Sequence, residues 1–206
     1  RAIDEYLKLL DDKPDDYQLI NRIGDLYLQV GRVPEAIDAF KRAGQGWERG
    51  GFHGRAAAIY KKARREAPDD VDLASRLAEC YRQSNLLNEA VKVHMEVADY
   101  FTKKGLLKRA LEEFNKVVQL EPKNIRNKVK LADLYNREGM KERAAEYYLE
   151  AAESLALEGR QTEAHQAVER AKAMVNTPKV FLTMSRISII QKDLPGASEH
   201  LRAGLQ

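Results

Sequence analysis

The chain has 206 residues, of which 33% are charged and 44% hydrophobic, a balance that excludes an intrinsically disordered chain. Its formal net charge of +3 is too small to indicate a nucleic-acid partner by itself. The single cysteine excludes an intramolecular disulfide and fits a reducing compartment, so we expect a cytoplasmic protein. No apolar run approaches the roughly 18 residues that a membrane-spanning helix needs, so we expect no membrane span.

The sequence repeats itself at a spacing of 54 residues. Residues of the same type recur at this spacing in several columns: Pro14, Pro68 and Pro122; Tyr27, Tyr81 and Tyr135; Ala36, Ala90 and Ala144; Gly51, Gly105 and Gly159. The fourth position of the proline column holds Asn176. Repetition at this scale indicates a solenoid, in which each unit buries its apolar face against its neighbours. A binding scaffold is therefore the first functional hypothesis.

Hydrophobic periodicity predicts three amphipathic helices in each module, and no strand. In chain order, the expected helices are 2–11, 16–30, 34–49, 53–66, 70–83, 87–103, 107–119, 124–137, 141–157, 161–174, 178–191 and 194–205. Asp15 or Asp16 is the expected N-cap of the helix over 16–30, and Gly31 ends it. The modules are 14–67, 68–121 and 122–175, with partial units at both ends. Because the chain opens on Arg1 within the repeat register, we expect residues 1–206 to be a single solenoid segment of a longer protein.

These columns resemble the tetratricopeptide repeat (TPR) family, whose signature pairs a large-x-x-Leu-Gly/Ala-x-x-Tyr helix with an Ala-x-x-x-Phe helix. The matching residues are Ile20, Ile23, Gly24, Tyr27, Ala36 and Phe40; Leu77, Ala78, Tyr81 and Ala90; and Leu131, Ala132, Tyr135, Ala144 and Tyr148. The resemblance implies an all-α, right-handed α-solenoid of about twelve stacked antiparallel helices. It further implies a non-catalytic scaffold or adaptor that binds a protein or peptide along a groove.

The period departs from the usual TPR length of about 34 residues. The second helix of each module explains the extra length, because it also serves as the first helix of another hairpin. In the first module, Gly44 on that helix is followed by Tyr60 and Pro68 in the pattern that Gly24 makes with Phe40.

Candidate partner-binding residues lie on the polar stripe of the first helix of each module, which we call the free stripe. At about 100° per residue these side chains point away from the apolar stripe, and in TPR proteins this face lines the groove. They are Asn21, Asp25, Ser75, Glu79, Arg82, Arg126, Lys130, Asp133, Asn136, Arg137 and Arg186. For each of them the alternative is a merely solvated polar face. Because the stripe becomes basic and apolar toward the C-terminal end, we expect an acidic partner segment with apolar anchors.

No pattern of residues indicates catalysis. The four histidines, at 53, 94, 165 and 200, lack metal-ligand spacing, while His94 and Cys80 fall in core columns. We therefore expect no enzymatic activity, no cofactor, no metal and no small-molecule substrate.

Two other functions stay open. One is a nucleic-acid-binding helical repeat, for which the basic cluster Lys61, Lys62, Arg64 and Arg65 is interrupted by acidic residues. The other is a regulatory repeat domain of a larger enzyme. By analogy, long arrays of extended repeats resemble bacterial scaffold proteins, including those of type IV pilus and cell-polarity systems that engage a Ras-like GTPase.

Overall fold

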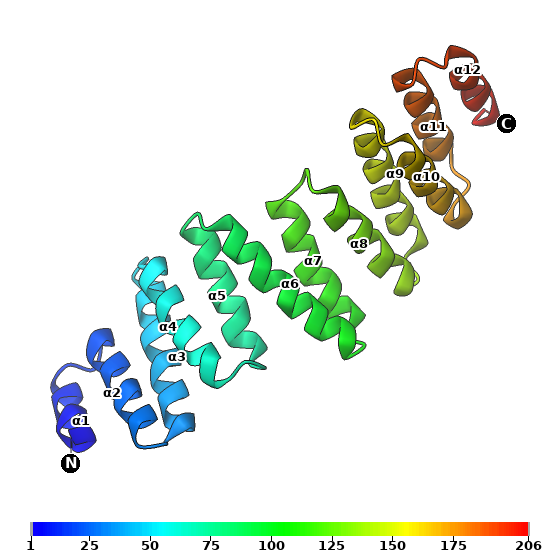
Figure 1. Cartoon of the computed structure of the whole chain (residues 1–206). Helices are drawn as coiled ribbons and strands as arrows, with labels where there is room; N and C mark the ends of the chain where they lie inside the picture. Colours follow the sequence, from blue (N-terminus) through cyan, green and yellow to red (C-terminus); the bar gives the residue numbers. More distant parts are fainter. Residues whose placement is uncertain (1, 206) are drawn as a thin grey trace. The chain divides into compact units, whose positions relative to one another are not determined.

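The computed structural model describes residues 2–205, and within that range the chain forms twelve α-helices and no strand (Figure 1). The predicted all-α solenoid is thereby confirmed. Among residues 2–205 no helix is both long and apolar enough to cross a membrane.

The helices recur in three sets at the predicted spacing of the modules. The first helices are α2 (Tyr17–Gln29), α5 (Val71–Gln83) and α8 (Ile125–Arg137). The second helices are α3 (Val33–Arg49), α6 (Leu87–Lys103) and α9 (Lys141–Leu157). The third helices are α1 (Ala2–Asp12), α4 (His53–Glu66), α7 (Leu107–Leu120) and α10 (Gln161–Met174). The chain closes with α11 (Pro178–Ile190) and α12 (Leu194–Ala203).

Polar caps fix the starts of the first helices. Asp16, Asp70 and Asn124 each accept a backbone hydrogen bond from the residue three positions later, at 3.0, 3.0 and 3.3 Å. Such bonds satisfy N–H groups that the first helical turn leaves unpaired. Thr177, which precedes α11, makes no such side-chain bond. The N-cap prediction for Asp16 is confirmed.

Glycine sets where α2 ends, because Gly31 has φ +76°, a conformation that other residues rarely adopt. The prediction that the last helix continues to residue 205 is wrong. That helix, α12, ends at Ala203, and Gly204 is its C-cap.

The chain forms two compact units, one ending at Val97 and the other beginning at Ala98. In the first unit, α2 packs against α1 and α3, and α4 packs against α3 and α5. In the second unit, α8 packs against α7 and α9, while α9 also contacts α10 and α11, and α11 packs against α12. Because α3 contacts both α2 and α4, and α9 contacts both α8 and α10, the second helix of these modules belongs to two hairpins, as predicted.

A small residue facing a larger one marks each of these hairpins. A Cβ atom built on Gly24 would lie 2.5 Å from the Phe40 ring, and one built on Gly44 would lie 2.5 Å from the Tyr60 ring. Both rings are fully buried. The helices of the first unit therefore approach so closely because these two positions lack a side chain. In the second unit the same positions hold the buried pairs Ala98 and Phe114, Ala132 and Tyr148, and Ala152 and Val168.

Candidate functional site

The free stripe of α2 is joined to α4 by one lysine. Lys62 Nζ donates a hydrogen bond to Asn21 Oδ1 at 3.0 Å and forms an ion pair with Asp25 Oδ1 at 2.5 Å. The same ammonium lies 4.8 Å from the centroid of the Phe40 ring, which belongs to α3. All three helices of the first module thus contribute to one cluster of an acid, a base and an aromatic ring. Two predicted site residues, Asn21 and Asp25, therefore have partners inside the module.

The same arrangement recurs in the third module. Arg170 of α10 lies 3.7 Å from Asp133 of α8, and its guanidinium carbon lies 5.7 Å from the centroid of the Tyr148 ring. The Tyr148 hydroxyl also donates a hydrogen bond to Asp133. Burial of this hydroxyl, together with its bond to the Asp133 carboxylate, raises the pKa of Tyr148 to about 12. Asp133, like Asp25, is therefore held by its own module.

On α5 the predicted residues Glu79 and Arg82 are partners of each other. Arg82 donates to the Glu79 carboxylate through Nη2 at 2.5 Å and Nε at 2.8 Å, and Gln83 adds a third bond at 2.8 Å. The hydrogen bonds from Arg82 are the main cause that lowers the pKa of Glu79 to about 2. Ser75, one turn earlier on α5, is half-buried.

The cations of α8 differ from the residues above. Arg126, Lys130 and Arg137 are exposed, and within residues 2–205 none of them forms a hydrogen bond or an ion pair. Their spacing places them on one face of the helix, with Asp133 between Lys130 and Arg137. Asn136 is also exposed. Arg126 also helps Arg160 to lower the pKa of Glu163 on α10, without forming an ion pair with it. The structure therefore gathers three positive charges that form no ion pair on one helix face of the second unit.

Arg186 continues the free stripe onto α11, where it has a partner. Its Nη1 lies 3.0 Å from Glu153 Oε1 of α9. The Arg186 side chain is still 57% exposed. Because an ion pair this exposed to water is weak, the guanidinium group can still interact with a partner protein.

Two bases of the third helices, Lys62 and Arg170, contact the free stripe, which the sequence analysis does not predict. It grouped Lys62 with Lys61, Arg64 and Arg65 as one basic cluster, whereas Lys62 contacts the free stripe and Arg64 pairs with Glu96 at 2.7 Å. It did not assign Arg170. Both could have been found from the repeat, since Lys62 and Arg170 stand in one column two periods apart.

The residues that carry reactive side chains elsewhere are buried in the core. His94 is 3% exposed and Cys80 is fully buried. Burial raises the pKa of the Cys80 thiol to about 12, which keeps it protonated at neutral pH. Within the described part of the chain, no three His, Cys, Asp or Glu side chains are grouped so as to hold a metal ion. The core interpretation of His94 and Cys80 is confirmed.

Three solved structures are similar to this chain over most of its length. BtubC (BKLC) from P. vanneervenii is 15% identical, with 98% of this chain and 90% of that chain covered, at a TM-score of 0.43. YrrB, described as a TPR protein with an unusual peptide-binding site, is 17% identical, with 80% of this chain and 97% of that chain covered, at a TM-score of 0.33. The pilF protein of Pseudomonas aeruginosa is 18% identical, with 82% of this chain and 90% of that chain covered, at a TM-score of 0.28.

Family comparison agrees with the signature columns. Models described as tetratricopeptide repeat match residues 1–49, 51–99 and 125–154. No curated protein sequence matches the chain significantly. The matched segments contain α2 and α3 in full, and α8 with most of α9, and in each pair a small residue faces a buried aromatic ring. The chain therefore belongs to the tetratricopeptide repeat family.

Proposed function

We propose that this chain is a non-catalytic scaffold that binds an acidic segment of a partner protein along α8. The TPR family generally supplies non-catalytic protein-interaction modules, and the repeats of this chain support that general role. The observation that carries the specific proposal is the row of Arg126, Lys130 and Arg137, exposed on one face and unpaired within residues 2–205.

Charge balance within the stripe favours an acidic partner. Asp133, the acidic residue in this row, is already engaged by Tyr148 and Arg170. Tyr148 and Arg170 therefore partly neutralise the negative charge of Asp133, and the exposed face of α8 carries a net positive charge. A partner carboxylate is attracted to such a face, which steers association and sets orientation.

Apolar side chains on α11 extend the proposed surface. Leu182, Ile189 and Ile190 are 43%, 53% and 38% exposed. Each buried methylene group contributes about 0.8 kcal/mol, so a partner with one or two apolar anchors gains affinity that charge alone does not supply. Arg186 and Asn136 belong to the edge of this surface, and Asn21, Asp25, Ser75, Glu79 and Arg82 form the equivalent stripe of the first unit.

A charge reversal tests the proposal. We take as probe a fluorescein-labelled peptide, Glu-Asp-Leu-Glu-Glu-Ile-Glu, and measure its binding by fluorescence anisotropy. An exposed ion pair contributes up to ~1 kcal/mol, so each single change to Glu should weaken binding by less than about fivefold. The triple variant Arg126→Glu, Lys130→Glu, Arg137→Glu should weaken it well beyond tenfold, with an unchanged melting temperature.

The matched control changes the same amount of charge elsewhere in the second unit. Lys103, Lys104 and Lys108 are exposed, and their combined change to Glu should lower affinity only through long-range attraction, which 0.5 M salt suppresses. Equal loss of binding in both triple variants at that salt concentration would refute the assignment to α8.

A further inference from the structure

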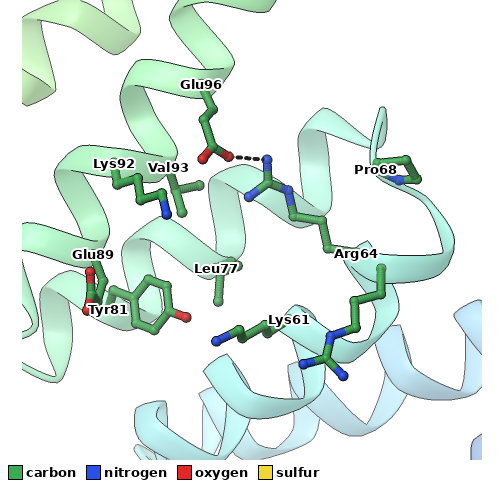
Figure 2. Close-up of a pocket in the computed structure, with 10 residues that line it drawn as sticks. Lys61, Arg64, Pro68, Leu77, Tyr81, Glu89, Lys92, Val93 and Glu96 are labelled. Atoms are coloured by element: carbon green, nitrogen blue, oxygen red, sulfur yellow. Dashed lines mark hydrogen bonds and ion pairs between the residues drawn. The ribbon is translucent and has the colours of Figure 1, made fainter.

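A hollow of about 400 Å³ lies in the first unit, bordered by α4, α5 and α6 (Figure 2). Its volume is at the lower end of the range found for small-ligand sites. Leu77, Val93 and the ring of Tyr81 supply apolar surface, and Lys61, Arg65 and Lys92 surround it. In Figure 2 the ammonium of Lys61 and the hydroxyl of Tyr81 point toward one another across this space. The hollow thus combines an aromatic face with positive charge.

The third module shows what fits such a space, because the same positions are filled there. Tyr147 occupies the position equivalent to Val93, and its ring stacks on Tyr135, the equivalent of Tyr81. The two ring centroids are 5.6 Å apart and the rings are inclined by only 9°. The Tyr147 hydroxyl lies 3.4 Å from Oδ1 of Asn115, which stands one 54-residue period after Lys61. In the third module a tyrosine side chain therefore occupies this position, where the first and second modules have Ala39 and Val93.

Exposure of the two equivalent tyrosines agrees with this comparison. Tyr135 is only 3% exposed beneath the Tyr147 ring, whereas Tyr81 is only partly buried. Valine is shorter than tyrosine by a whole ring. Replacement of that ring by Val93 therefore leaves one face of Tyr81 without its stacking partner, and an aromatic pair of this kind contributes about 0.5–1.5 kcal/mol beyond the area that it buries.

The border of the hollow differs in charge from the equivalent border one period later. One 54-residue period later along the chain, Lys61, Arg65 and Lys92 are replaced by Asn115, Gln119 and Glu146. Within residues 2–205, Lys61, Arg65 and Lys92 form no hydrogen bond or ion pair. Arg64, which also borders the hollow, is already paired with Glu96. Glu89 also borders the hollow beside Tyr81, but the cations outnumber the acidic residues of the lining. The excess of positive charge around an apolar recess favours an occupant that carries negative charge next to its ring.

We propose that this hollow binds a tyrosine side chain of a partner protein, stacked on Tyr81 and flanked by acidic residues that meet Lys61, Arg65 and Lys92. This surface is separate from the row of cations on α8, so the two proposals stand or fall independently.

The test uses the chain as it stands and a fluorescein-labelled peptide, Asp-Glu-Tyr-Glu-Asp, followed by anisotropy. The Val93→Tyr variant restores the ring that the third module has, so it should melt at or above the temperature of the unaltered protein and lose at least about tenfold in affinity. The Lys61→Glu, Arg65→Glu variant changes only exposed side chains. It should lose at least about tenfold as well, and it decides the matter if Val93→Tyr does not fold.

Two controls complete the design. A peptide with Ala in place of Tyr should bind at least about tenfold more weakly, and the triple α8 variant should bind the tyrosine peptide as the unaltered protein does. The proposal is overturned if a folded Val93→Tyr protein binds normally, if the Ala peptide binds equally well, or if only a phosphotyrosine version of the peptide binds.

Discussion

Replacement of Gly44 by alanine tests whether the close contact of α3 with α4 depends on the absence of a side chain. A Cβ atom on Gly44 would lie 2.5 Å from Cε1 of Tyr60, too close for two carbon atoms unless one moves. The Tyr60 ring is fully buried, and its hydroxyl donates a hydrogen bond to Glu48 Oε2 at 2.7 Å. Because core packing surrounds the ring and a hydrogen bond fixes its hydroxyl, Tyr60 has little freedom to change its side-chain rotamer.

Two effects of opposite sign determine the size of the change. Overpacking of a filled core costs about 1–3 kcal/mol, while alanine in a helix interior is about 1 kcal/mol more favourable than glycine. Gly44→Ala should therefore lower the free energy of unfolding by up to about 2 kcal/mol. In a Tyr60→Val background the ring is absent, so only the higher helix propensity of alanine acts. The same change should then raise the free energy of unfolding by about 1 kcal/mol. The third module already carries this combination as Ala152 and Val168, both buried.

Urea unfolding of the two single variants, the double variant and the unaltered protein gives the four corners of this cycle, with helicity as the signal. The midpoint and slope are both required, because a change in slope means that the transition no longer reports one cooperative unit. Gly54→Ala is the matched control, since its Cβ atom would meet nothing within 4 Å. The packing argument is refuted if Gly44→Ala has the same effect with Tyr60 present as with Val in its place.

Three further outcomes are expected. Cys80 is fully buried and burial raises its thiol pKa to about 12, so Ellman's reagent at pH 8 should react only after urea unfolds the protein; fast reaction of the folded protein would contradict this. The carboxylate of Glu79, whose pKa is lowered from 4.5 to about 2, stabilises the fold above pH 4.5 and loses this effect as the pH falls through 2. The melting temperature of Glu79→Gln should therefore lie slightly below that of the unaltered protein at pH 7, by less than the equivalent of about 1 kcal/mol for so exposed a pair, and the difference should vanish near pH 2. Finally, Thr177 makes no side-chain cap, so Thr177→Asp should stabilise the fold by about 0.5–1 kcal/mol in thermal melts, and an unchanged melting temperature would argue against the cap.

The helices could be predicted to within a residue or two because each boundary has a local cause. Asp16 caps α2 with its own side chain, and Gly31 adopts the positive φ that ends the helix. These are interactions between near neighbours in sequence, so the residue types alone indicate them. The end of α12 was predicted wrongly because the apolar pattern continues through Leu205, whereas the helix stops at Ala203.

The internal partners of the free stripe could not be predicted with the same reasoning. Periodicity shows that Asp25 points away from the core, but it does not show that Lys62, on another helix, reaches it at 2.5 Å. That contact depends on how α2 and α4 both flank α3, which is a property of the packed module. The hollow beside Tyr81 is even more difficult to predict from the sequence. It arises because Val93 has no aromatic ring, and it is recognised only when Val93 is compared with Tyr147 in the same column of the repeat.

Arg186 shows how a change of one residue in a connection alters the stripe. The segment 121–124 joins α7 to α8, whereas the segment 175–177 that joins α10 to α11 is one residue shorter. A strict count of 54 would align Arg186 with Ala132, a fully buried position. The shorter connection instead aligns it with Asp133, so a base replaces the acid of the earlier modules, and it pairs with Glu153 of α9. The charge of this column therefore reverses between α8 and α11, and an acidic segment that follows the stripe through the second unit meets cations on both helices.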